Sequence, residues 1–161
     1  GSREVIANLP YNISTKILIN LLKNSRQFSK LTMMFQKEVA NRIIAKPGSK
    51  PYGRLSVITQ LKTKTKILFD IPDTAFFPKP KVQSSLVQFI PYENKKHNFD
   101  FEKMEELTRF VFAKKRKMLR TIFKKEGGSS FLNSINVYPN IRPENLTLDE
   151  FCKLEFALRK H

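Results

Sequence analysis

The first residues of the chain constrain its fold most strongly, because their character changes three times within a short span. The apolar run Val5-Ile6-Ala7 is followed by the turn-like stretch Asn8-Leu9-Pro10-Tyr11 and then by an amphipathic run over residues 13–22. This order predicts a short buried strand, a tight turn and the start of a helix. α/β proteins use this layout for ligand sites at the carboxyl ends of their strands.

The turn residues also carry chemistry. Pro10 pushes Leu9 toward an extended conformation, which leaves the Leu9 carbonyl available as an acceptor. The Asn8 side chain offers an amide oxygen and Tyr11 a flat ring, so the set suits a planar heterocycle with an exocyclic amine, such as adenine. The alternative interpretation is a plain strand-to-helix turn, with Asn8 favoured for its turn geometry and Tyr11 in the core.

Hydrophobic periodicity predicts the remaining elements. Apolar runs without alternation predict strands that are buried on both faces, and apolar residues at helical spacing predict helices. We expect strands at residues 3–7, 31–35, 63–71 and 84–90, the last two paired as a hairpin, and helices at residues 14–24, 38–44, 54–61 and 101–125. Thr147 and Glu150 form a capping box that begins a final helix, which we expect to bury Phe151, Leu154, Phe156 and Leu158.

The charge of the chain indicates a polyanionic partner. Its 161 residues include 30 Lys and Arg against 14 Asp and Glu, which gives a net charge of +16. Nucleic acid is the leading candidate and an anionic membrane surface is the second. The basic residues are spread over the whole chain rather than confined to one helix, and no apolar run approaches the roughly 18 residues of a membrane span. We therefore predict no membrane association.

The basic residues gather in two segments. One segment is the breaker-rich loop at residues 46–51, where Lys46, Lys50 and the nearby Arg54 lie beside Tyr52. In the expected helix at residues 101–125, Arg116, Arg120 and Lys124 recur at a spacing of four and would form one stripe. No acidic residue lies between positions 114 and 125 to pair with them, which favours phosphate contact over a solvated surface.

Two single residues are expected to have structural roles only. Cys152 is the only cysteine, so the chain forms no internal disulfide, suits a reducing cytoplasm, and places the thiol in the core. His97 lies in a polar linker, and no neighbouring His, Cys or acidic cluster gives metal-ligand spacing, so we expect a solvated histidine and no metal site.

Three blocks, in order, resemble the ribosomal RNA adenine dimethyltransferases of the KsgA family. They are the stretch Asn8 to Thr15, the block from Gln36-Lys37-Glu38-Val39-Ala40 to Tyr52-Gly53-Arg54-Leu55-Ser56-Val57, and the run Phe76-Phe77-Pro78-Lys79-Pro80-Lys81-Val82-Gln83-Ser84-Ser85. Weaker similarity continues to Leu158.

The resemblance implies dimethylation, by S-adenosylmethionine (SAM), of the exocyclic amines of two adjacent adenosines in small-subunit (16S) ribosomal RNA, as part of rRNA processing and ribosome biogenesis. It assigns the catalytic role to Asn8, Leu9, Pro10 and Tyr11, base stacking to Tyr11 and Phe76, and cofactor contact to Asn8. The expected RNA contacts are Lys50, Arg54, Lys79, Lys81, Lys114, Arg116, Lys117, Arg120 and Lys124.

The implied fold is α/β: the C-terminal half of a Rossmann-like methyltransferase sheet over residues 1–92, in the family's strand order 4-5-7-6, then a small all-α C-terminal domain over residues 93–161. The Gly-rich turn and acidic residue that hold a nucleotide cofactor are missing from the sequence. We therefore expect a fragment that is inactive alone and binds SAM weakly. Its strand at residues 3–7 would be an exposed edge, liable to pair with another copy.

Two alternatives remain. One is the macrolide-resistance methylase, which modifies large-subunit RNA; Leu9 in place of Ile and the long C-terminal match favour the small-subunit enzyme. The other is an RNA-binding module without catalysis. The expected partner is the small ribosomal subunit and the expected location is the cytoplasm.

Overall fold

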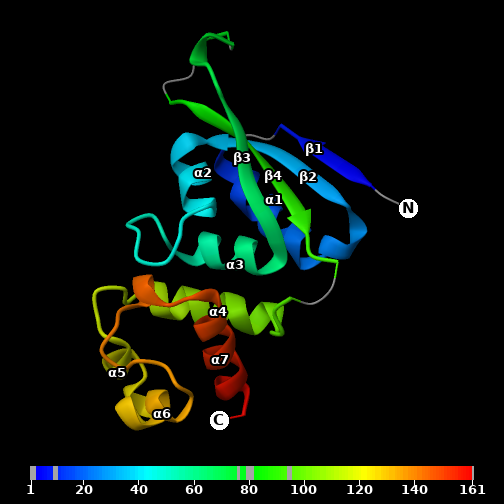
Figure 1. Ribbon diagram of the computed structural model, residues 1–161. Helices are drawn as coiled ribbons and strands as arrows, with labels where there is room; N and C mark the ends of the chain where they lie inside the picture. The colour runs from blue at the N-terminus through cyan, green and yellow to red at the C-terminus, as the bar shows by residue number, and fades with distance from the viewer. Residues whose placement is uncertain (1–2, 9–10, 76, 79–81, 94–95, 161) are drawn as a thin grey trace.

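The computed structural model describes residues 3–8, 11–75, 77–78, 82–93 and 96–160, with only the backbone of residues 11 and 12. An α/β half is followed by a helical half, as predicted (Figure 1). The first half contains β1 (Glu4–Ala7), α1 (Tyr11–Lys23), β2 (Lys30–Gln36), α2 (Lys37–Ile43), α3 (Arg54–Lys62), β3 (Thr63–Ile71) and β4 (Ser84–Pro91). The second contains α4 (Phe101–Phe112), α5 (Leu119–Ile122), α6 (Ser129–Ser134) and α7 (Leu148–Arg159).

The strands form a four-stranded sheet in the order β1-β2-β4-β3, which is the expected order 4-5-7-6. β1 and β2 are parallel, and β4 is antiparallel to both β2 and β3. The predicted hairpin and the predicted edge position of β1 are confirmed.

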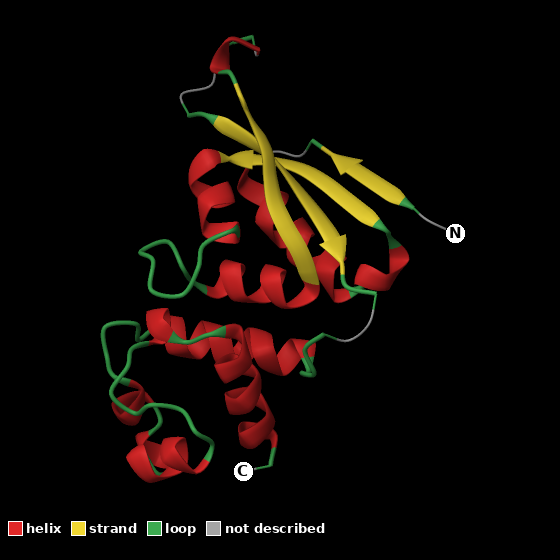
Figure 2. Cartoon of the chain, in the orientation of Figure 1, coloured by secondary structure: helices red, strands yellow, loops and turns green. Residues whose placement is uncertain are grey.

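The prediction that β1 is buried on both faces is wrong. Leu31, Met33 and Phe35 alternate along β2 and belong to one buried cluster, to which α1, α2 and α3 also contribute. These three helices lie on one side of the sheet (Figure 2). Val5 of β1 packs against this cluster, whereas the side chain of Ile6 is 80% exposed. A continuous apolar run predicts two covered faces, but the described helices pack on one face of the sheet.

The helical half continues the same buried cluster. α4 lies directly below α3 (Figure 1) and contributes Met104 and Val111 to it. The hydroxyl of Tyr52, in the loop before α3, donates a 2.7 Å hydrogen bond to the carbonyl of Leu146 in the helical half. The proposed domain boundary after residue 92 stays a prediction.

The predicted single helix at residues 101–125 is wrong, because the helix ends at Phe112. Residues 114–117 are four consecutive cations, which a helix would hold close together without acidic partners. The amides of Leu119 and Arg120 instead donate to the carbonyls of Ile141 and Pro139, at 2.8 and 2.9 Å. A loop distant in sequence thus supplies the acceptors that a continuous helix would have provided.

The predicted capping box of α7 is confirmed. The Thr147 hydroxyl accepts from the Glu150 amide at 3.1 Å, and the Glu150 carboxylate accepts from the Thr147 amide at 2.9 Å. Phe151 and Leu154 are fully buried as expected, but Phe156 is 47% exposed. The acidic Glu155, rather than Phe156, lies on the buried face of α7.

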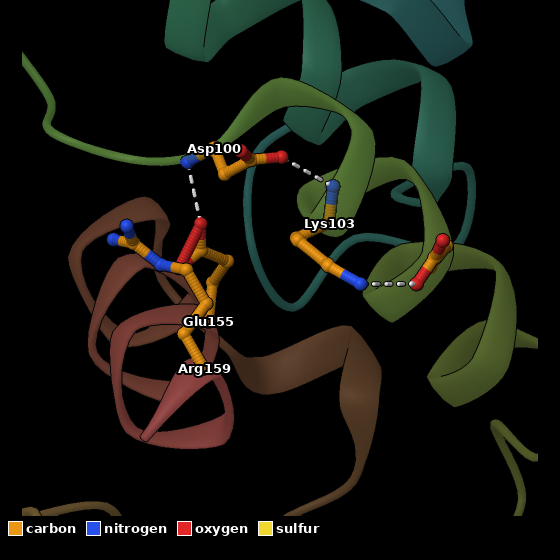
Figure 3. Close-up of polar contacts among 5 residues, drawn as sticks. Asp100, Lys103, Glu155 and Arg159 are labelled. Carbon is orange, nitrogen blue, oxygen red and sulfur yellow. Dashed lines mark hydrogen bonds and ion pairs between the residues drawn. The ribbon is translucent and has the colours of Figure 1, made fainter. Parts of the chain in front are cut away.

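Glu155 is only 2% exposed, and its two oxygens have different partners (Figure 3). One accepts from the backbone amide of Asp100 at 2.5 Å, and the other accepts from Arg159 Nε at 2.6 Å. Asp100 in turn caps α4 by accepting from the Lys103 amide at 2.9 Å. The buried carboxylate therefore joins the start of α4 to the end of α7.

The prediction of a solvated His97 is also wrong. Its side chain is 11% exposed, and Nδ1 lies 3.5 Å from an oxygen of Asp149. Burial lowers the pKa of His97 more than Asp149 raises it, and Lys96 lowers it further. The Cys152 thiol is only half-buried rather than fully in the core; burial and the nearby Asp149 and Glu155 raise its pKa to about 11.

Among the described residues, no helix combines the length and apolar character needed to cross a membrane. The same residues contain no group of three His, Cys, Asp or Glu side chains that could hold a metal ion.

Candidate functional site

One edge of the sheet gathers the ends of the motif blocks. Ala7 at the end of β1 is level with Met33 of β2, Gln36 at the end of β2 pairs with Ser84, and Ser84 pairs with Ile71 at the end of β3. The carboxyl ends of β1, β2 and β3 and the start of β4 therefore meet at one edge. The block at residues 8–11 follows β1, and the block at residues 76–81 connects β3 to β4, so both blocks begin near this edge.

The structure shows part of the predicted catalytic turn. Asn8 directly follows β1 and is exposed to solvent, and Tyr11 is the first residue of α1. The other predicted site residues of the two blocks lie outside the described part of the chain, as does the Tyr11 side chain: Leu9, Pro10, Phe76, Lys79 and Lys81. The catalytic and base-stacking roles stay predictions.

An ion pair joins the end of β3 to the start of α2 at this edge. Lys37 Nζ lies 2.5 Å from Asp70 Oδ2, and the other oxygen of Asp70 accepts from Ser85 Oγ at 2.7 Å. The Lys37 amide also donates to the Gln83 carbonyl at 2.8 Å. The hydrogen bonds from Lys37 and Ser85 lower the pKa of Asp70. These contacts position the two flanks of the block at residues 76–81 at this edge.

A cleft of about 1080 Å³ lies where α1, α2 and α3 face α4. The loop before α3 closes one side of it. Six basic residues and two acidic residues line this cleft: Lys16, Arg42, Lys50, Arg54, Arg109 and Lys115, with Glu38 and Glu105. The lining therefore has an excess of positive charge and offers a site for an anionic ligand.

The two acidic residues of the cleft are already paired. Arg42 Nη2 lies 2.9 Å from Glu38, and Arg54 Nη2 lies 3.4 Å from Glu105. No ion pair to a described residue is found for the other bases of the cleft, Lys16, Lys50, Arg109 and Lys115. Their charge is available to phosphate groups of a ligand.

The loop that carries Lys50 is held in place by its own contacts. The Gly48 amide donates to the Glu144 carbonyl at 2.6 Å, and Gly48 has a positive φ of 89°, which favours glycine. Tyr52 is 3% exposed and its ring packs edge-on against Phe112 at 6.0 Å. Tyr52 therefore anchors the loop, rather than presenting its ring beside Lys50 and Arg54 to a phosphate ligand.

The second basic segment does not form the predicted stripe, because the helix that would align it ends early. Arg116 lies in a turn, Arg120 in α5, and Lys124 in a short 3-10 segment. Lys114 lies over the Phe110 ring at 4.4 Å, and Lys117 follows in the same turn. We call residues 113–120 the basic turn; Lys115 connects it to the cleft.

Sequence reasoning missed three bases of the cleft. Lys16, Arg109 and Lys115 line the cleft but are not among the RNA contacts expected from the sequence. Each is a common surface residue type on a different element, so only the tertiary arrangement of α1, α4 and the basic turn around the cleft brings them together. A one-dimensional pattern holds no signal for that arrangement.

The described residues do not make up a SAM site. Such a site needs glycine in a turn that leads from a strand into a helix, where the backbone approaches the ligand closely. Gly48 and Gly53 lie in the loop before α3, and Gly127 and Gly128 lie between a 3-10 segment and α6. Asn8 is the one described candidate for cofactor contact.

Comparison with known sequences points to one family. The profile of the ribosomal RNA adenine dimethylase family matches residues 3–160. The chain is 46% identical over 153 residues to "Ribosomal RNA small subunit methyltransferase A" of Wolbachia sp. subsp. Drosophila simulans (strain wRi), covering 94% of this chain and 56% of that protein. The protein of the same name from Gluconobacter oxydans (strain 621H) is 41% identical, with 94% and 50% covered. The chain thus spans about half the length of these relatives.

Solved structures agree with the sequence comparison. A dimethyladenosine transferase from Plasmodium falciparum superposes with a TM-score of 0.81 at 29% identity, covering 98% of this chain and 66% of that one. The 23S rRNA methyltransferase ErmE, at 18% identity and a TM-score of 0.65, shares the fold. The match over nearly the whole chain, together with this identity to the small-subunit methyltransferases, shows that the chain belongs to the ribosomal RNA adenine dimethylase family.

Proposed function

We propose that this chain provides the RNA-binding and base-accepting side of an enzyme that uses SAM to dimethylate two adjacent adenosines of small-subunit ribosomal RNA. The observation that carries the proposal is the strand register, which brings Asn8 and both flanks of the block at residues 76–81 to one edge of the sheet. Family membership supplies the reaction class, and the modification would be a step in ribosome biogenesis.

In this proposal the exocyclic amine of adenine donates its hydrogens to the Asn8 side chain and the Leu9 carbonyl. Two acceptors favour a pyramidal nitrogen whose lone pair points outward, away from the ring system. Tyr11 and Phe76 stack on the extruded base, and stacking at about 1–3 kcal/mol per ring offsets the few kcal/mol that extrusion costs. Positioning of the amine, rather than a strong base, then provides most of the rate enhancement.

The RNA backbone would follow two basic surfaces, the cleft and the basic turn. Lys16, Lys50 and Arg109 of the cleft, which have no described acidic partner, contact phosphates next to the target adenosines. The basic turn extends this contact into the helical half. Both surfaces fit a single polyanion because Lys115 belongs to each.

We further propose that the chain on its own binds RNA without transferring methyl groups, because its described residues do not form a SAM site. The exposed Ile6 at the sheet edge also makes β1 a candidate for pairing with a second copy.

The test of the proposed partner is competition binding to unmethylated small subunits, with large-subunit RNA as competitor, over a range of salt concentrations. We expect a preference for the small subunit, and binding that weakens steeply with salt. A preference for large-subunit RNA would instead support the macrolide-resistance alternative, which the 39–46% identity to small-subunit methyltransferases disfavours. Equal binding to any RNA would support a general RNA-binding module.

A further inference from the structure

One exposed aromatic residue in the helical half has no role in the site described above. Tyr138 lies in the segment between α6 and α7, and its side chain is 75% exposed. Two other aromatic residues of this half are exposed, but cations cover both rings. Lys114 lies 4.4 Å from the Phe110 ring centroid, and Lys160 lies 4.2 Å from that of Phe156. Among the described residues, no ring or cation contact is found for Tyr138.

The loop that carries Tyr138, residues 137–142, is held firmly. Val137 before it is 1% exposed, and Ile141 after it packs against the buried cluster. The loop passes alongside α5 (Figure 1), and its carbonyls accept from the amides of Leu119 and Arg120. An aromatic ring on a fixed loop loses little conformational freedom when a ligand stacks on it.

The same contacts place the loop beside the basic turn. Arg120 Nη1 donates to Asn140 Oδ1 at 2.6 Å, and Arg142 Nε donates to the Arg116 carbonyl at 2.9 Å. Residues 113–142 contain eight basic residues and one acidic residue, Glu126. The exposed ring therefore lies in a strongly positive surrounding, the combination of stacking platform and phosphate contacts that binds single-stranded nucleic acid.

We propose that Tyr138 is a stacking site for an unpaired RNA base whose flanking phosphates contact the basic turn. The inference rests on the proposed RNA-binding function and adds a subsite that is separate from the base-accepting turn at Asn8. A double-stranded segment would not use the ring, because its bases are already stacked and its edges are turned inward. The site therefore takes a loop, bulge or single-stranded end.

The chain contains no tryptophan, so a Tyr138→Trp variant carries a single fluorescent reporter at the proposed site. We expect an oligoadenylate of about ten nucleotides, long enough to reach both the ring and the basic turn, to quench this tryptophan. A blunt RNA hairpin should bind without quenching. A Phe156→Trp variant is the matched control: its ring position lies under Lys160 and Arg159, and its fluorescence should not respond to either RNA.

Binding measured by fluorescence anisotropy gives the energetic test. Tyr138→Ala should weaken oligoadenylate binding roughly 5- to 150-fold, the loss of one stacked base. The dependence on salt should not change, because no charge is removed. Tyr138→Phe should bind like the unaltered chain, because the ring rather than the hydroxyl is used.

The outcomes separate the two proposals. Quenching by the single strand, with weaker binding of Tyr138→Ala, supports the subsite. Salt-dependent RNA binding without quenching, unaffected by Tyr138→Ala, overturns the subsite and leaves the RNA-binding function intact. Absence of RNA binding even at low salt overturns both.

Discussion

Lys37 and Asp70 form a 2.5 Å ion pair across the sheet edge where the family's motif blocks begin. Lys37 opens α2 directly after β2, and Asp70 lies near the end of β3. Both side chains are about 40% exposed, so the pair adds little to overall stability. Its effect is local: the β2–β4 ladder fixes the hairpin against β2, and the ion pair joins the end of β3 to the start of α2.

The pair predicts a specific pH dependence. The hydrogen bonds lower the pKa of Asp70 in the folded state, so its stabilising contribution is present at neutral pH and disappears as the pH falls through that lowered pKa. A Lys37→Met variant should be less stable than the unaltered chain at pH 7, with the two converging in acid. NMR titration of Asp70 in both chains measures the pKa of its carboxyl group, which should be higher in the variant. An unchanged Asp70 pKa in the variant would contradict the assignment.

The buried carboxylate of Glu155 predicts a larger effect. Glu155→Ala removes the acceptor for the Asp100 amide and the partner of Arg159, and it leaves a cavity between α4 and α7. Unfolding by urea should show a loss of about 2–4 kcal/mol. Glu106→Gln is the control: Glu106 is exposed and pairs loosely with Lys103 at 3.7 Å, so its loss should change stability by less than about 0.5 kcal/mol. Equal losses in the two variants would show that Glu155 has no special role.

His97 predicts a second loss of stability on acidification, at milder pH. Burial lowers the folded-state pKa of His97, so the unfolded chain binds its proton more tightly and stability falls as the pH drops below about 6.5. His97→Gln should remove this part of the decline between about pH 7.5 and 5.5, as followed by urea unfolding at each pH. If the unaltered chain instead gains stability over the variant on acidification, the Asp149 contact outweighs burial.

The cleft and the basic turn should each contribute phosphate contacts to RNA binding. Lys50→Ala in the cleft and Lys117→Ala in the basic turn should each weaken binding for all RNA sequences. Each should also reduce the slope of log affinity against log salt by about 1, because each removes one phosphate contact. Lys64→Ala, an exposed lysine on β3 outside the cleft lining, is the control and should leave the slope unchanged. An equal effect of Lys64→Ala would mean that only net charge matters.

Local sequence signals predicted the elements well where a pattern is complete within one segment. The Thr147 capping box and the β3–β4 hairpin are examples, because their interactions are short-range. The prediction of one helix over residues 101–125 failed because the end of α4 depends on tertiary contacts. The backbone acceptors at Pro139 and Ile141 lie about twenty residues away in sequence. The predictions of a solvated His97 and a buried Phe156 are wrong for the same reason, since burial depends on tertiary partners.

The candidate site also has a part that was predictable from local sequence and a part that depends on tertiary packing. Asn8 and the sheet edge followed from the strand–turn–helix pattern at the start of the chain. The cleft did not, because Lys16, Arg109 and Lys115 come from three separate segments and only their packing joins them. The family resemblance identified the motif blocks, but only the strand register showed that they leave the sheet at one edge.

The most direct test of the account is transfer of labelled methyl groups from SAM to unmethylated small ribosomal subunits. It compares this chain, a chain extended to the length of its relatives, and the extended chain with Asn8→Ala. We predict transfer by the extended chain only, with a loss of at least about 100-fold in the Asn8→Ala variant. If the extended chain binds the subunits but transfers nothing, or if Asn8→Ala transfers normally, the assignment of the sheet edge at Asn8 as the base-accepting site is wrong.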